Sequence, residues 1–223
     1  MTHITNRLTC DAILFDLDGV LIDSSRCITR HWQEWATQHG LDILKIMHIA
    51  HGMRTIETIR AVAPYLDAEE ETRRFTAHEI ADTEGVVAIA GAAEALATLP
   101  PQAWALVTSG SRELVMARLA RAGLPVPGVL VSGDDVSQGK PSPEPYLAGA
   151  RQLGMSAAQC IVIEDAPAGV ESGKKASMRV VGIAATHPRE ELLEKGADVV
   201  VDALTNLRIH VTNAGHSLAV EMV

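Results

Sequence analysis

The sequence is poor in aromatic residues, cysteine and basic charge, and each shortage narrows what the protein can be. Aromatic residues make up 3% of the 223 residues, so we expect a core of aliphatic side chains. The three cysteines are odd in number and far apart, which favours reduced thiols over a disulfide framework. A formal net charge of −9 without a basic stripe argues against nucleic-acid binding.

Long apolar segments are also missing. No apolar run reaches the length of a membrane span, and residues 1–10 are polar, unlike a signal peptide. We therefore expect a cytoplasmic protein without membrane contact, and the sequence leaves open whether it is a monomer or a homodimer. A length of 223 residues suits one core domain plus a smaller inserted domain.

The order of apolar runs indicates an α/β protein with a helical insert. The segment CDAILFDLDG predicts a buried strand that feeds a loop, and residues 24–83 then show helical spacing. After this insert, five apolar runs alternate with helical segments at residues 111–122, 143–153, 166–176 and 188–195. This alternation predicts a parallel sheet, because such strands need helical crossovers. The C-terminal segment predicts a hairpin that turns at residues 213–215.

Polar residues follow the apolar runs at four places. They are Asp16 and Asp18; Thr108 and Ser109; Lys140; and Glu164 and Asp165. Because the carboxyl ends of parallel strands face one ligand crevice, we expect these side chains to meet. Carboxylates suit Mg²⁺, whereas a lysine, a hydroxyl and loop amides suit phosphate oxygens.

Four segments resemble the successive motifs of the haloacid dehalogenase superfamily. They are FDLDGVLIDS, VTSGS, GKPSPEPY and VIEDAPAGVESG, and they occur in the family's order. The resemblance implies a Rossmann-like core of residues 1–22 and 86–223 with a helical cap inserted at residues 23–85. It also implies a phosphatase that acts on a small phosphorylated metabolite through an aspartyl phosphate.

The resemblance implies catalytic and phosphate-binding roles for individual residues. Asp16 would attack phosphorus, and Asp18 would protonate the leaving oxygen and then activate water. Thr108 would bind a phosphoryl oxygen, helped by the backbone of Ser109. Lys140 would neutralise charge between Asp16 and the phosphate.

The resemblance also implies a Mg²⁺ site. The ligands would be the Asp16 carboxylate, the Asp18 backbone carbonyl and Asp165, and Glu164 would support the ion. In the insert, His51, Arg54 and Thr55 lie where one predicted helix ends and the next begins. They either face the substrate crevice or lie on the solvated surface.

Three functions stay open at this point. Segments such as HGMRTIETI and QGKPSPEPYL resemble glycerol-phosphate phosphatases and bacterial sugar phosphatases, which favours hydrolysis of a polyol or sugar phosphate. The β-phosphoglucomutase branch shares DLDGV but typically has a cap histidine where this chain has Ile28, which weakens the phosphomutase reading. A binding protein without turnover is the third case, and the intact acidic residues argue against it.

Overall fold

A six-stranded parallel sheet forms the centre of the computed structural model, which describes residues 7–212 and 217–223. Its strand order is β6-β5-β2-β7-β8-β9. These strands are β2 (Ala12–Phe15), β5 (Trp104–Val107), β6 (Leu130–Val131), β7 (Cys160–Glu164), β8 (Arg179–Ile183) and β9 (Val199–Val201). Every residue of β2, β5 and β7 is buried, as continuous apolar runs predict for central parallel strands. The predicted α/β fold is confirmed.

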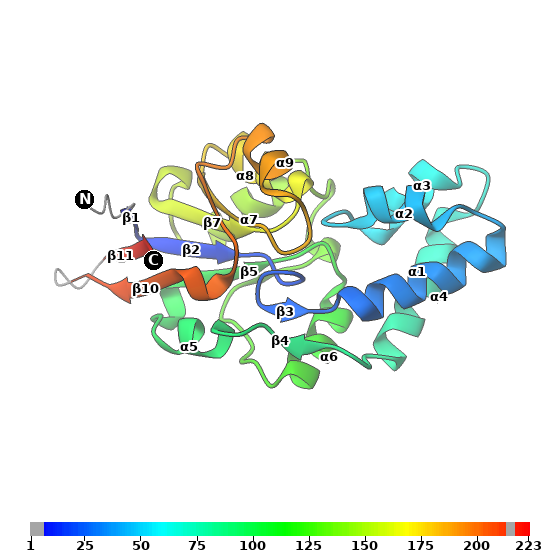
Figure 1. The fold of residues 1–223 in the computed structure, drawn as a ribbon, viewed down its shortest axis with the longest axis horizontal. Coiled ribbons are helices and arrows are strands. Elements are labelled where there is room, and N and C mark those ends of the chain that lie inside the picture. Colours follow the sequence, from blue (N-terminus) through cyan, green and yellow to red (C-terminus); the bar gives the residue numbers. More distant parts are fainter. Residues whose placement is uncertain (1–6, 213–216) are drawn as a thin grey trace.

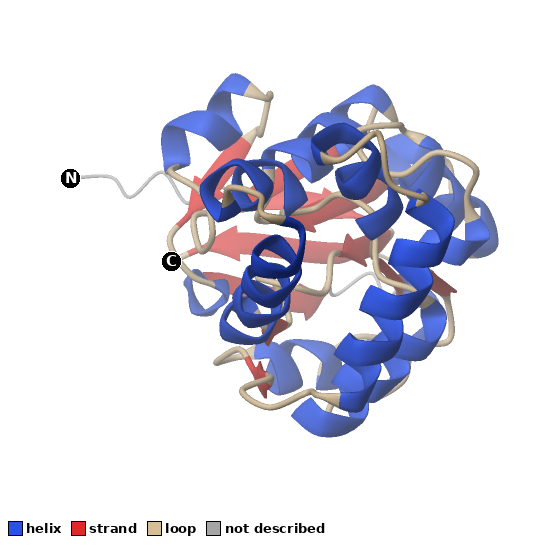
Figure 2. Cartoon of the chain, turned by 90° about the vertical axis from the view of Figure 1, so that its right-hand side faces the viewer, coloured by secondary structure: helices blue, strands red, loops and turns tan. Residues whose placement is uncertain are grey.

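Helices cover both faces of this sheet (Figures 1 and 2). Helices α5 (Ala92–Ala97) and α6 (Arg112–Ala122) lie on one face, and α7 (Glu144–Gln152), α8 (Pro167–Lys175) and α9 (Arg189–Glu194) lie on the other. Residues of β2 pack alternately into the two apolar cores, because successive side chains of a strand point to opposite faces of the sheet. Phe15 therefore packs in the cluster of α6, whereas Leu14 packs with Tyr146 of α7.

Four helices lie beyond the carboxyl ends of the strands, and we call them the cap (Figure 1). They are α1 (Ser25–His39), α2 (Ile43–Ala50), α3 (Thr55–Val62) and α4 (Ala68–Ala81). Gly40 ends α1 in the left-handed conformation, as its position predicts. The cap has its own apolar cluster around Trp32, Trp35 and Phe75, so the tryptophan stripe predicted from the sequence is cap core.

Two small sheets join the elements at the edges. Strands β10 (Leu207–Val211) and β11 (Leu218–Met222) pair antiparallel as the predicted hairpin, and β1 (Arg7–Cys10) adds to β11. The predicted turn at residues 213–215 lies outside the described residues. Strands β3 (Ile22–Asp23) and β4 (Val87–Ala88) pair where the chain leaves for the cap and returns from it. Short 3-10 turns occupy Pro101–Ala103, Gly133–Asp135, Ala157–Gln159 and Leu204–Asn206.

The three thiols, Cys10, Cys27 and Cys160, are buried and unpaired. Within the described ranges, no helix combines the length and the apolar character that a membrane crossing requires.

Candidate active site

Three neighbouring strands deliver polar side chains to one edge of the sheet. Asp16 follows β2, Thr108 follows β5 and Glu164 ends β7, and β2 lies between the other two strands. The chain runs outward from β2 through β5 to β6 and then returns to β7 on the other side of β2. Such a reversal creates a crevice at the carboxyl ends of the strands. The strand order therefore brings these residues together, as we predicted from the sequence.

Three carboxylates meet in this crevice. One oxygen each from Asp16, Glu164 and Asp165 lies within 4.8 Å of the others, and all three residues are buried. Burial raises the pKa of Asp16 to about 7, although the nearby Lys140 ammonium lowers it. Burial, followed by the charges of Glu164 and Asp16, raises the pKa of Asp165 well above its ordinary value. Ionising all three carboxylates together is therefore unfavourable unless further positive charge comes to the cluster.

Lys140 is the ammonium that faces this cluster. Its Nζ donates hydrogen bonds to Asp16 Oδ1 at 2.5 Å and to Glu164 Oε1 at 2.6 Å, and the side chain is 1% exposed. Burial disfavours the charged form of Lys140, but Asp16 and Glu164 hold its pKa above the ordinary value. One ammonium against three carboxylates leaves an excess that a divalent cation with oxygen ligands fits.

Glu164 is occupied on both oxygens. Its Oε1 accepts hydrogen bonds from Lys140 and, at 2.7 Å, from the Tyr146 hydroxyl. Its Oε2 accepts from the backbone amides of Asp165 at 3.0 Å and Ala166 at 3.2 Å. These four bonds match the acceptor capacity of a carboxylate. Glu164 is therefore placed to position Lys140 and the start of the loop after β7.

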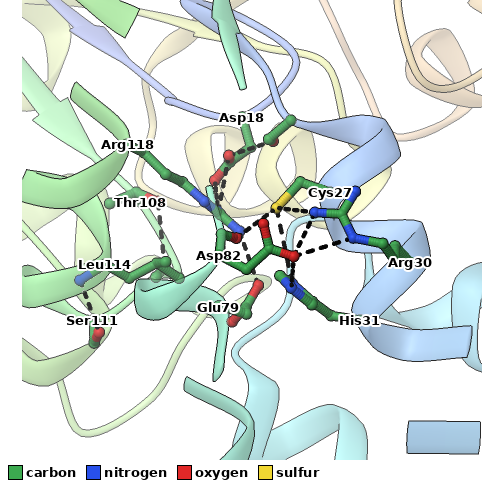
Figure 3. A network of polar contacts seen from close by, with 12 residues as sticks. Asp18, Cys27, Arg30, His31, Glu79, Asp82, Thr108, Ser111, Leu114 and Arg118 are labelled. Carbon is green, nitrogen blue, oxygen red and sulfur yellow. Dashed lines mark hydrogen bonds and ion pairs between the residues drawn. The ribbon is translucent and has the colours of Figure 1, made fainter. Parts of the chain in front are cut away.

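Asp18 lies in a second charged group, with Arg118 and Glu79 (Figure 3), and lines the same cavity as Asp16. Arg118 Nη1 donates to both Asp18 carboxylate oxygens at 2.9 Å, and the Ser24 hydroxyl donates to Oδ1 at 2.5 Å. Arg118 Nη2 donates to Glu79 Oε1 at 2.8 Å. The sequence reasoning missed Arg118 and Glu79, because each one looks like an ordinary polar residue of an amphipathic helix.

The loop after β5 holds the predicted phosphate-binding residues. Thr108 is 4% exposed, and its Oγ1 accepts a hydrogen bond from the Gly110 amide at 3.2 Å. The Ser109 hydroxyl donates to the Gly52 carbonyl of the cap at 2.7 Å. This arrangement leaves the Ser109 backbone, rather than its side chain, for a phosphoryl oxygen.

The structure places the three cap candidates in two different environments. His51 and Thr55 line the cavity between cap and sheet, together with Asp16 and Asp165. Arg54 is not among the described lining residues of this cavity. Its guanidinium donates to carbonyls of the loop after β6, to Val136 and Ser137 at 3.0 Å each, and pairs with Glu57 at 2.6 Å.

A parallel sheet with a carboxylate cluster at its reversal point defines an α/β enzyme built around a buried acidic centre, whose oxygen ligands suit a divalent cation. The chain belongs to the haloacid dehalogenase-like hydrolase family, whose model matches residues 13–183. The resemblance found in the sequence motifs is thereby confirmed.

Known relatives of the chain include phosphatases. It is 39% identical to hexitol phosphatase A of Escherichia coli, over 91% of this chain and 95% of the relative. It is 36% identical to glycerol-1-phosphate phosphohydrolase 1 of Saccharomyces cerevisiae, over 93% of this chain and 88% of the relative. Among solved structures, a hydrolase from Pseudomonas syringae matches with a TM-score of 0.77 and 27% identity, over 87% of this chain and 94% of that chain.

Proposed function

We propose that the chain is a magnesium-dependent phosphatase that hydrolyses a small polyol or sugar phosphate monoester. The observation that carries this proposal is the buried Asp16 carboxylate, held by Lys140 within a cluster of three buried carboxylates at the cavity. The similarity to hexitol and glycerol phosphate phosphatases supports the substrate class. We expect the enzyme to work in the cytoplasm.

Asp16 is the proposed nucleophile. Lys140 binds Asp16 Oδ1, and in the described structure Asp16 Oδ2 accepts no hydrogen bond, so a carboxylate oxygen is left to attack phosphorus. The new bond joins Asp16 to phosphorus, and the bond between phosphorus and the ester oxygen breaks. We assign the Thr108 hydroxyl and the Ser109 backbone to bind phosphoryl oxygens, and their position in the cavity lining supports this assignment.

Asp18 is the proposed acid and base. It gives a proton to the leaving oxygen and later takes one from the water that cleaves the aspartyl phosphate. Because Arg118 and Ser24 hold the Asp18 carboxylate in the structure, proton transfer requires Asp18 to exchange these partners for the reacting oxygen.

The proposed Mg²⁺ ligands are the carboxylates of Asp16 and Asp165 and the Asp18 backbone carbonyl. Glu164 is assigned to a supporting role, because its oxygens already accept four hydrogen bonds. A bound Mg²⁺ supplies stabilisation of the negative charge that develops on the phosphoryl group. Gly19 supports this site, because its backbone passes directly beside the Asp165 carboxylate.

The phosphomutase alternative finds less support in the cavity. The residue at the position of the mutase histidine is Ile28, and its side chain lines the cavity without a titratable group. A mutase would return an isomerised phosphate ester rather than free phosphate.

The test is a phosphate-release assay over a panel of hexitol, hexose and glycerol phosphates, with Mg²⁺ and with EDTA. We expect release with Mg²⁺, loss of release in EDTA, and none above background for Asp16→Asn, because a neutral amide does not attack. Release that EDTA leaves unchanged would contradict the metal site. An isomerised product without free phosphate would establish the mutase instead.

A further inference from the structure

The cavity has a second charged wall, made by Arg118, Asp18 and Glu79. Arg118 comes from α6 and Glu79 from the cap helix α4, so core and cap build this wall together. Arg118 is 3% exposed and Glu79 is 4% exposed, and both line the cavity. Figure 3 shows the guanidinium between the two carboxylates.

The guanidinium of this wall is engaged by carboxylates of the protein. One guanidinium faces two carboxylates, and its two terminal nitrogens are engaged, Nη1 by Asp18 and Nη2 by Glu79. An arginine in a phosphatase cavity often binds an anionic part of the substrate. Here that capacity is already used within the protein, so Arg118 is not free to pair with an anionic group of the substrate.

The rest of the cavity offers little positive charge. Arg118 is the sole lysine or arginine among the described residues that line it. The neighbouring wall includes the His51 imidazole, the hydroxyls of Ser25 and Thr55, and the apolar side chains of Ile28 and Trp32. Hydroxyl side chains donate and accept hydrogen bonds, so they suit the hydroxyls of a neutral molecule.

We infer that this enzyme selects an uncharged, hydroxyl-bearing leaving group and rejects a leaving group with a second anionic group, and that Glu79 sets this selection. The inference rests on the proposed phosphatase function and adds the charge class of the substrate. A carboxylate or second phosphate on the leaving group would meet the buried Glu79 carboxylate, whose partner Arg118 is already engaged, and like charges near a buried group repel strongly. A hydroxymethyl group at the same place meets no such repulsion.

The test compares substrate pairs that differ in this one group. Glycerol 1-phosphate is paired with 3-phosphoglycerate, and 2-hydroxyethyl phosphate with phosphoglycolate. Burial raises the pKa of Glu79 to about 7, so assays at about pH 8 keep Glu79 ionised. We expect the wild type to favour the neutral member of each pair by about tenfold or more in kcat/KM.

Three variants test the role of Glu79. Glu79→Gln keeps a hydrogen-bond acceptor for Arg118 but removes the charge. It should lower the ratio of kcat/KM for the neutral substrate to kcat/KM for the anionic one by about tenfold. Glu79→Asp keeps the charge and should keep the preference. Glu69→Gln makes the same change on the exposed side of α4, where Glu69 pairs with Arg60, and should leave the preference unchanged.

The outcomes separate this inference from the proposed function. Equal or reversed preference in the wild type would overturn the inference even if Glu79→Gln failed to fold. A preference that stays the same in folded Glu79→Gln would overturn it as well. If no substrate of either pair and no compound of the wider panel released phosphate in a Mg²⁺-dependent way, the phosphatase function and the inference would both be overturned.

Discussion

Gly19 shows how one residue sets the geometry of the carboxylate cluster. Its φ of +82° is left-handed, and a Cβ built on it would lie 2.0 Å from Asp165 Oδ2. The loop that carries Asp16 and Asp18 therefore passes against Asp165 without space for a side chain. We predict that Gly19→Ala displaces Asp165 and lowers kcat about a hundredfold, because sub-ångström placement of reacting groups is lost.

The control for this prediction is Gly123→Ala. Gly123 also has a left-handed φ, of +68°, but nothing lies within 4 Å of a Cβ built there. This variant should lose about 1 kcal/mol of unfolding free energy, measured by denaturant titration, and keep its activity. If Gly19→Ala kept its activity as Gly123→Ala does, the close approach of Gly19 to Asp165 would not be needed for catalysis.

At the scale of elements, Arg54 joins the start of α3 to the loop after β6. It donates to the Val136 and Ser137 carbonyls, and Glu57 accepts from the Gly139 amide at 3.1 Å. We predict that Arg54→Ala raises KM about tenfold and changes kcat less than about threefold. The cap would close less tightly over the substrate, while the catalytic residues stay in place.

Arg60→Ala is the matched control for steady-state kinetics. Arg60 lies on the same helix, and its pairing with Glu69 is on the exposed surface. This change should leave KM unaltered, because exposed ion pairs contribute little. An unchanged KM in Arg54→Ala would show that the contacts with the loop after β6 do not hold the cap over the substrate.

Most of the elements could be predicted from the sequence because their patterns are local. The apolar run before Asp16 predicts a buried central strand, and β2 is buried throughout. Gly40 and Gly123 end their helices in left-handed conformation, as glycine does at such positions. Strands β1, β3 and β4 were not predicted. β3 and β4 have only two residues each, and the four residues of β1 mix polar with apolar side chains instead of forming an apolar run.

At the scale of the whole molecule, the topology explains which part of the site could be predicted. Parallel strands bring their carboxyl ends to one edge, so the meeting of Asp16, Glu164 and Asp165 follows from strand order. The pairing of Arg118 with Glu79 depends on how α6 packs against α4, and no local pattern encodes that packing. For the same reason, the sequence did not decide whether Arg54 faces the substrate crevice or lies on the solvated surface.

The central claim is that Asp16 becomes phosphorylated, and the Asp18→Asn variant gives the most direct access to that state. This variant lacks the base that activates water, so the aspartyl phosphate should accumulate. An aryl phosphate is the substrate, because its leaving group needs no proton.

The measurement is peptide mass spectrometry after acid quenching of Asp18→Asn with this aryl phosphate and Mg²⁺. The account predicts phosphate on Asp16 and none when EDTA replaces Mg²⁺. Phosphate on a different side chain, or continued phosphate release by Asp16→Asn in the same assay, would contradict it.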